Sequence, residues 1–570
     1  MFELLTEIKN ANAAVWLNGQ DISLAYGSQA LSAELINKVK DDKEALISFL
    51  SSRQIFSQKA FENMPQWQRY PLSFAQQRLL FIERMSSGDA YLIPVCFNLE
   101  QSADLIRLQF ALDIVIARHA SLRTVFAQDN EGDDYQQVTD ATVTIEVEDF
   151  ATTGALHDAL EKQQSKPFDL GQTVMRANIL QCGEQRVLLF VWHHIVFDGW
   201  SVAVFLKDFE RAYIHGEALS LPELQYADYA CWQRELMSGE VGAQQLAYWK
   251  SNLSEVQPLA LLTDFNRPMQ SDYCGEDLHM RFESQLASTL KQVAKEHSTT
   301  LYTVLLSAFS LILGRFSNQS DVVIGTPSDN RHNAQVQDMV GFFVNSLPIR
   351  LQLDNDASMA LLIQQSHQQI AAAKVNQDIP FEQMVQALEL SRDPSRHPIF
   401  QVLFSLQQNN GETATSALPM REVEPSTQVR AYSPAKFDLT LIMNDTEQGL
   451  EATFNFATSL FKRSSIEHIA TAFQCVLEQI AHSTSAKLPE YSLLSGQTRE
   501  RLMSWAKPDE QFMCSSSKKG VHLIQAFEAQ VLASPEAVAL CFDAQQLSYG
   551  ALNERANQLA HWLHVRYEAT

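Results

Sequence analysis

The chain has 570 residues, of which 46% are hydrophobic and 19% charged. This composition is ordinary for globular protein, and the length suggests roughly three or four domains. The net charge of −24 argues against nucleic-acid and anionic-membrane partners, because a broadly acidic surface repels phosphate groups. The first residues carry acids where a signal peptide needs bases, and no apolar run reaches membrane-spanning length.

The seven cysteines are odd in number, widely scattered and without a CxxC pair. Neither a disulfide framework nor a zinc site is therefore predicted, and we expect no bound metal. Such cysteine usage fits the reducing cytoplasm, which is the predicted location.

Residues 1–55 predict a small α/β unit. A short helix is expected near Phe2–Ile8, followed by a tight β-hairpin at Asn18-Gly19, because Asn-Gly tolerates the positive φ of a primed turn. Two short helices follow, with Ser32 and Asp41 as expected N-caps. A unit of this size buries little core and is more often an interaction module. Residues 56–70 are expected to be a linker.

From residue 71 to about 490, helical stripes alternate with strand-like runs, which is an α/β pattern. The clearest elements are the strands Val187–Trp192 and Val322–Ile324 and the helices Leu105–Arg118, Trp200–Tyr213 and Ile466–Ile480. Because 400 residues exceed one ordinary core, two subdomains are predicted, at 71–255 and 256–495. Residues 496–521 are expected to be a second linker. Residues 522–570 predict a helix, a strand and a helix that open a further domain.

The most specific signal is the run from Val187 to Ser201, VLLFVWHHIVFDGWS. Its apolar part predicts a strand buried on both faces, which ends at the pair His193-His194. The turn signal Asp198-Gly199 follows, and an amphipathic helix then begins. A histidine pair on the turn between a buried strand and a helix lies where α/β folds tend to place chemistry.

This HHxxxDG pattern resembles the signature of nonribosomal peptide synthetase condensation domains, which belong to the chloramphenicol-acetyltransferase-like superfamily. Other segments resemble that family's motifs in the same order: Leu72–Leu79 (LSFAQQRL), Arg118–Phe126 (RHASLRTVF), Tyr226–Trp232 (YADYACW), Ile324–Arg331 (IGTPSDNR), Val340–Ser346 (VGFFVNS) and Asn376–Glu382 (NQDIPFE). Ala120 stands where the family usually has an acid, and Asp329 where alanine is commoner.

The resemblance implies an α/β fold of two chloramphenicol-acetyltransferase-like subdomains in a V-shaped pseudo-dimer. Residues 1–55 resemble the β-hairpin docking domains that begin some synthetase subunits. The segment Leu547–Ala560 resembles the first motif of an adenylation domain, so residues 522–570 are expected to be its truncated start.

As an enzyme, such a domain is an acyltransferase: it forms an amide bond between an aminoacyl or peptidyl thioester and the amine of an aminoacyl acceptor. Both substrates are carried on the phosphopantetheine arms of partner carrier proteins, and no bound cofactor is implied. The implied partners are an upstream donor carrier with its C-terminal docking peptide, a downstream acceptor carrier and an adenylation domain in cis.

The resemblance also assigns roles to residues of the signature. His194 is the catalytic position, as a proton acceptor or as a group that orients the amine; both readings remain open. His193 is expected to be structural. Asp198 is either a triad-like orienter of His194 or, as we prefer, the ion-pair partner of Arg331. Gly199 either lets the pantetheine arm or the oxyanion approach the backbone N–H, or is an ordinary turn glycine.

Further candidates belong to the frame or to the substrate channel. Arg78 and Arg123 are expected to hold the active-site frame, with a plain structural ion pair as the alternative for each. Four residues are assigned to the channel: Trp200, Ser201, Asn345 and Gln377. The alternative is packing for Trp200 and a satisfied core polar group for Asn345 and Gln377.

Two other functions stay open from the sequence. One is a non-catalytic, condensation-like platform that only recruits partners. The other is a starter condensation domain that uses a fatty acyl donor. The intact histidine signature argues against the platform, and the docking-like unit argues against the starter domain.

Overall fold

The computed structural model describes residues 13–18, 21–26, 32–44, 46, 69–85, 90–216, 219–389, 393–408, 418–423, 433–446, 448–506, 522–542 and 545–567. The chain divides into two compact units, Met1–Ser495 and Gly496–Thr570, and each is described by itself. The helix predicted near Phe2–Ile8 lies outside the described residues. So do nearly all of the linker predicted at 56–70 and residues 507–521 of the second linker.

The signature strand is the centre of a five-stranded sheet in the order β14-β4-β9-β8-β7. Its strands are β4 (Leu92–Leu99), β7 (Ile145–Asp149), β8 (Met175–Cys182), β9 (Gln185–His193) and β14 (Met420–Glu422). β9 pairs antiparallel with both β4 and β8, and only β7 and β8 pair in parallel.

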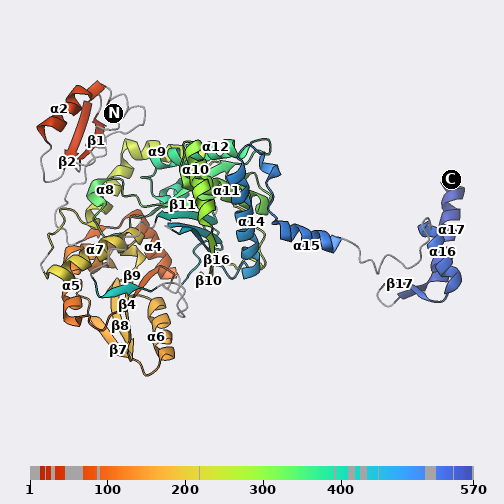
Figure 1. Ribbon diagram of the computed structural model, residues 1–570, viewed down its shortest axis with the longest axis horizontal. Coiled ribbons are helices and arrows are strands. Elements are labelled where there is room, and N and C mark those ends of the chain that lie inside the picture. The colour runs from red at the N-terminus through yellow and green to blue at the C-terminus, as the bar shows by residue number, and fades with distance from the viewer. Residues whose placement is uncertain are drawn as a thin grey trace. The chain divides into compact units, whose positions relative to one another are not determined.

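Helices cover both faces of this sheet (Figure 1). They are α4 (Phe74–Met85), α5 (Leu105–Arg118), α6 (Thr153–Ser165) and α7 (Gly199–His215). Leu188, Phe190 and Trp192 of β9 pack in the core with α5 and α7, whereas Val187, Leu189 and Val191 pack in the core with α6. The prediction of a strand buried on both faces is therefore confirmed, and its uninterrupted apolar run follows from this double burial.

The second half of the unit is built on a six-stranded sheet, in the order β10-β16-β15-β13-β11-β12. Its strands are β10 (Gly275–Phe282), β11 (Asp321–Ser328), β12 (Asn345–Gln352), β13 (Val402–Gln408), β15 (Leu439–Thr446) and β16 (Gly449–Ala457). Its helices are α10 (Ser284–Glu296), α11 (Leu301–Ser317), α12 (Met359–Val375) and α14 (Arg463–His482). They pack with the sheet into one large apolar core (Figure 1).

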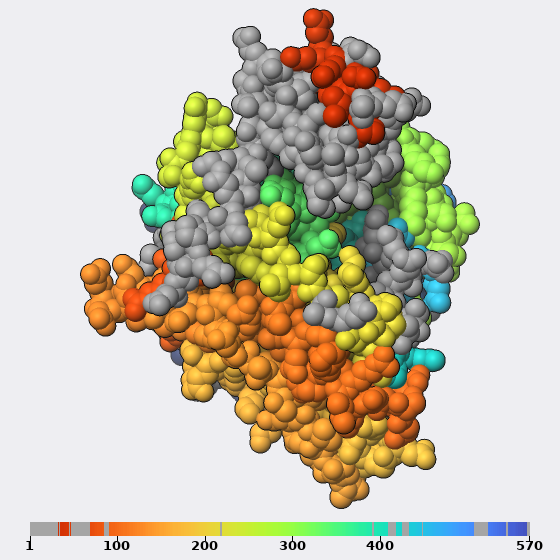
Figure 2. All heavy atoms as spheres, turned by 90° about the vertical axis from the view of Figure 1, so that its left-hand side faces the viewer, coloured from red at the N-terminus to blue at the C-terminus, as the bar shows by residue number. Residues whose placement is uncertain are grey.

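A third sheet and three further helices also belong to the first unit. A three-stranded sheet contains β3 (Tyr70–Pro71), β5 (Thr124–Gln128) and β6 (Asp134–Val138), and the helices are α8 (Tyr226–Ser238), α9 (Glu240–Asn252) and α13 (Phe381–Ala387). β14 comes late in the chain but pairs with β4, so the second half of the unit contributes a strand to the sheet of the first half. The first half of the unit, which contains the five-stranded sheet, forms the orange-to-yellow surface in the lower part of Figure 2.

The N-terminal hairpin consists of β1 (Ala13–Asn18) and β2 (Asp21–Tyr26), paired antiparallel. Asn18 pairs with Asp21 as the last residue of β1, so it is not a loop residue of the predicted Asn18-Gly19 turn, and the connection at 19–20 lies outside the described residues. Helix α2 (Ala33–Asp41) begins after the predicted N-cap Ser32, whose Oγ accepts from the N–H of Leu35 at 3.2 Å. The prediction that Asp41 is the N-cap of the next helix is wrong, because Asp41 is the last residue of α2.

The second unit contains α15 (Gly496–Ala506), α16 (Leu523–Ala533), β17 (Val538–Phe542), β18 (Gln545–Ser548) and α17 (Tyr549–Tyr567). α15 lies within the stretch 496–521, whose role as a linker stays a prediction. None of the described helices is by itself long and apolar enough to cross a membrane. The bent pair α10–α11 reaches the length and apolar composition of a membrane span only when its two helices are taken together.

Candidate active site

The signature residues form a short connection between β9 and α7. β9 ends at His193, a single 3-10 turn covers His194–Val196, and α7 begins at Gly199. Asp198 caps α7, since its Oδ1 accepts from the N–H of Ser201 at 2.8 Å. Because side chains alternate along a strand, the two histidines leave the strand end on opposite faces.

His193 faces the protein interior and is completely buried. Its Nδ1 accepts from the backbone N–H of Ile195 at 3.1 Å, so the ring proton is on Nε2, which donates to Glu83 Oε1 at 3.0 Å. Both ring nitrogens are therefore used within the fold. A structural role for His193 stays a prediction, with which these contacts agree.

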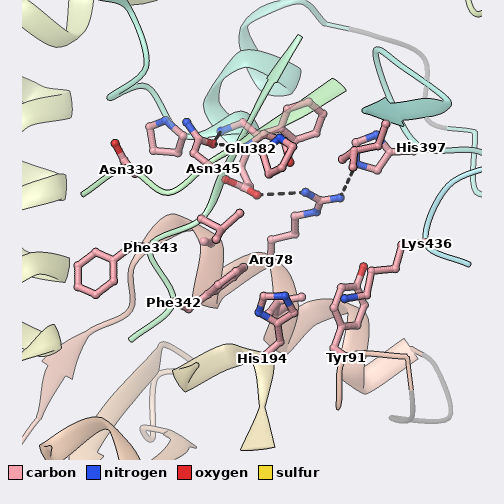
Figure 3. Close-up of a pocket in the computed structure, with 18 of the residues that line it drawn as sticks. Arg78, Tyr91, His194, Asn330, Phe342, Phe343, Asn345, Glu382, His397 and Lys436 are labelled. Atoms are coloured by element: carbon pink, nitrogen blue, oxygen red, sulfur yellow. Dashed lines mark hydrogen bonds and ion pairs between the residues drawn. The ribbon is translucent and has the colours of Figure 1, made fainter. Parts of the chain in front are cut away.

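His194 lies in the wall of a pocket instead (Figure 3). Its ring meets the ring of Phe342 edge-on at a centroid distance of 4.7 Å, and its buried Nδ1 has no hydrogen-bond partner among the described residues. Burial, with the nearby positive charge of Lys436, holds the pKa of His194 well below its ordinary value of about 6.5. The imidazole is therefore neutral at physiological pH and able to accept a proton.

Behind the His194 turn is a buried ion pair. Nη2 of Arg331 lies 3.1 and 3.2 Å from the two carboxylate oxygens of Asp198, and both side chains are essentially inaccessible to water. The same carboxylate accepts from Ser201 Oγ at 2.7 Å and from the N–H of Phe343 at 3.1 Å. None of these partners is His194, so the contacts fit the brace that we preferred over the triad-like arrangement.

Arg331 does not present a two-nitrogen fork to Asp198. Its Nη1 donates to the backbone carbonyls of Val336 and Met339, both at 2.6 Å, while the guanidinium lies 4.1 Å from the centre of the Phe343 ring. One arginine thus links the stretch 331–343 to the Asp198 turn. Burial lowers the pKa of Arg331 but the adjacent carboxylate opposes this shift.

A second polar cluster forms the pocket wall that faces His194 (Figure 3). Arg78 of α4 lies between Glu382 of α13, with Nη1 to Oε1 at 3.3 Å, and His397, with Nη2 to Nε2 at 3.0 Å. Nδ1 of His397 lies 3.1 Å from the carbonyl oxygen of Phe400, to which it donates, so Nε2 accepts from Arg78. Arg78 therefore has the ion pair that we considered for it, and it also lines the pocket.

The other predicted residues are placed differently. Asn345 lines the pocket, but its amide is satisfied by the carbonyls of Gln377 and Ile379 and by the N–H of Phe381. Gln377 accepts from Ser328 Oγ at 2.8 Å and is not part of the described lining. Trp200 is 46% exposed outside the pocket, and its Nε1 donates to the carbonyl of Gln337 at 2.9 Å.

Ser201 and Arg123 are not among the residues that line the pocket. Ser201 is completely buried and bonded to Asp198, Arg331 and Gly341, so the expectation that it lines the substrate channel is wrong. Its position in the first turn of α7 turns its hydroxyl toward the ion pair. Arg123 donates to the carbonyl of Thr139 at 2.7 Å and is absent from the described pocket lining.

Gly199 is exposed, and a Cβ built on it would meet no atom within 4 Å. Neither packing nor a positive φ therefore requires glycine at this position. The space in front of the start of α7 is open. Gly199 is likewise not among the described lining residues of the pocket that contains His194.

The sequence reasoning missed several pocket residues: Tyr91, Phe342, Glu382, His397 and Lys436. Phe342 and Glu382 belong to quoted motifs, so they could have been found there. Tyr91 falls between two of those motifs, whereas His397 and Lys436 follow the last of them, and only the fold brings these residues beside His194.

Comparison with known proteins identifies the family. The family model described as "Condensation domain" matches residues 66–503, well over half of the chain. The chain belongs to the condensation domain family. Such domains in nonribosomal peptide synthetases form amide bonds, so the enzyme class is an acyltransferase, and the predicted family and fold class are confirmed.

The curated relatives are much longer than this chain. The chain is 33% identical over 504 residues to gramicidin S synthase 2 of Brevibacillus brevis and 33% identical over 498 residues to surfactin synthase subunit 1 of Bacillus subtilis. The alignments cover 87% and 86% of this chain but only 11% and 14% of the relatives. The chain thus spans a small part of the curated relatives it matches.

Solved structures share the fold. The X-domain in complex with OxyB from teicoplanin biosynthesis is 25% identical with a TM-score of 0.70, covering 77% of this chain and 99% of that one. The condensation domain of the monacolin K polyketide synthase MokA is 21% identical with a TM-score of 0.65, covering 74% and 99%.

The condensation domain is predicted to lose stability in mild acid. Burial lowers the pKa values of His119, His194 and His397, so the unfolded chain binds more protons than the folded one below about pH 6.5. The free energy of unfolding should therefore decrease as pH falls from 6.5 toward 5.5, by up to ~1.4 kcal/mol per pH unit for each histidine. Thermal midpoints measured across this range test the slope.

The variant His397→Gln removes one of these histidines, so its free energy of unfolding should decrease less than that of wild type between pH 6.5 and 5.5. His468→Gln, on the exposed side of α14, is the matched control and should keep the wild-type slope. Parallel curves for wild type and His397→Gln would contradict the prediction.

Proposed function

We propose that this chain joins a carrier-bound aminoacyl or peptidyl thioester to the amine of a carrier-bound aminoacyl acceptor. The observation that carries the proposal is His194, a neutral imidazole at the wall of a pocket, on the motif that the family uses for catalysis. The phosphopantetheine arms of the two carriers bring the substrates, and the chain itself supplies the site.

Amide formation requires an unprotonated amine, alignment of the two groups and stabilisation of the developing oxyanion. His194 accepts the proton of the attacking amine or holds its N–H so that the lone pair faces the thioester. Alignment alone supplies ~7–11 kcal/mol in the best intramolecular reactions. The Asp198–Arg331 pair positions the turn that carries His194 and does not exchange protons with it.

The variant His194→Ala should lower the single-turnover rate of amide formation by ~10²–10⁴-fold, the usual contribution of a positioned acid–base group. Loaded donor and acceptor carriers are supplied, and product is quantified by mass spectrometry. His468→Ala, an exposed histidine of α14, is the matched control and should retain the wild-type rate.

Near-normal turnover of His194→Ala would remove His194 from the mechanism. Carrier binding by the wild-type chain without any product would favour the alternative of a recruitment platform. A parallel assay with fatty acyl donors tests the starter-domain alternative. Product in that assay alone would support this alternative.

We further propose that residues 1–55 dock the C-terminal peptide of an upstream subunit. The β1–β2 hairpin supports this proposal, because a two-stranded ribbon has strand edges to which an extended peptide can add. An adenylation domain in cis follows from the resemblance of Leu547–Ala560. A cytoplasmic location fits the scattered cysteines of the sequence, which include no CxxC pair.

Deletion of residues 1–55 should weaken association with the upstream subunit at least tenfold in a titration. The deletion variant should still condense freely supplied loaded carriers at the wild-type rate, because the pocket lies in residues 75–437. Unchanged subunit affinity would refute the docking proposal and leave the catalytic one intact.

A further inference from the structure

Lys436 is a cation in the pocket that the reaction outlined so far does not use. It lies just before β15, and its side chain lines the same pocket as His194 (Figure 3). Its ammonium lies 4.8 Å from the centre of the Tyr91 ring, and the described residues offer it no carboxylate or hydrogen-bond acceptor. Arg78, the other cation of the pocket, is by contrast paired with Glu382 and bonded to His397.

Lys436 is half-buried, and an ammonium group partly withdrawn from water without an acceptor is unfavourable; a single aromatic ring compensates only part of this cost. Burial accordingly lowers the pKa of Lys436 to about 8. The group therefore remains largely protonated at neutral pH, with N–H donors that the protein leaves unused. An oxygen that acquires negative charge in this pocket would satisfy them.

Lys436 and His194 also interact electrostatically. After burial, the positive charge of Lys436 is the largest cause of the low pKa of His194. The reacting amine must lie beside His194, so the carbonyl that it attacks lies within the field of Lys436. The other ionisable groups that line the pocket are Arg78, Tyr91, Tyr229, Glu382 and His397.

We propose that Lys436 donates a hydrogen bond to the oxyanion that forms on the donor's thioester carbonyl while the acceptor amine lies against His194. This inference rests on the proposed function. The sequence suggested the backbone N–H of Gly199 as the oxyanion donor, but Gly199 is outside the described lining of this pocket. The inference assigns that role to the Lys436 side chain instead.

The step balances without a further reactant. The amine lone pair forms the new N–C bond, and the carbonyl π electrons move to oxygen, where the ammonium of Lys436 stabilises them without transferring its proton. The C=O bond is then restored, the C–S bond breaks, and the pantetheine thiolate leaves. The proton lost by nitrogen passes to His194 and from there to the thiolate.

Two variants test the charge directly. Lys436→Met removes the charge at similar length, whereas Lys436→Arg keeps it. Lys436→Met should lower the single-turnover rate by ~10²–10³-fold, as for loss of one oxyanion donor, with less than a twofold change in the half-saturating carrier concentration. Lys436→Arg should retain at least a tenth of the rate, and Lys295→Met, on an exposed position of α10, should behave as wild type.

A pH profile separates this role from a merely structural one. The wild-type rate should fall as pH rises through about 8, where Lys436 loses its proton, and Lys436→Arg should move this decline beyond pH 9. In Lys436→Met, NMR titration should show the pKa of His194 raised, because the neighbouring positive charge is gone. The wild-type and Lys436→Arg profiles remain informative even if Lys436→Met does not fold.

A Lys436→Met rate within threefold of wild type, or coincident wild-type and Lys436→Arg profiles, would overturn the inference. Either result leaves the proposed function standing as long as the wild-type chain makes product in the same assay. A wild-type chain that makes no amide from any supplied donor overturns the proposed function itself.

Discussion

The buried ion pair between Asp198 and Arg331 is the interaction on which the site depends. Asp198 is the N-cap of α7, just after the turn that carries His194, whereas Arg331 follows β11 in the other sheet of the same unit. Two charges in the interior require each other: removal of one partner from such a pair typically costs ~3–5 kcal/mol, because the remaining charge is left buried and unpaired. The pair therefore links the two halves of the unit at the turn that carries His194.

The same geometry explains why adjacent histidines have different environments. Strand alternation directs His193 toward Glu83 in the interior and leaves His194 for the pocket. Burial without a partner on Nδ1 then keeps His194 neutral, and this neutral form is the one that amide formation needs. The ion pair acts on the backbone of this turn, through the cap of α7 and the N–H of Phe343, and its contacts do not include the imidazole.

Much of this arrangement could be predicted from local sequence. The buried strand, the turn and the helix that follows lie within about thirty consecutive residues, and helix α5 has the predicted bounds Leu105–Arg118. The pairing of Asp198 with Arg331 came from the motif resemblance. The pocket walls could not be predicted in the same way: Arg78 meets Glu382 across 304 positions of sequence, and no local pattern encodes such a contact. The burial of Ser201 depends likewise on Gly341, and the pairing of β14 with β4 on a distant return of the chain. Helix α15 was missed because it buries none of its residues, so it has no apolar stripe to signal it.

A double-mutant cycle on the ion pair is the most direct test of this account. The free energies of unfolding are measured for wild type, Asp198→Asn, Arg331→Met and the double variant. If the pair is the brace described above, each single change is costly and the double variant loses at least ~2 kcal/mol less than the sum of the single losses, because neither charge is left buried alone. Losses that add to within ~0.5 kcal/mol, the behaviour of independent sites, would contradict the account.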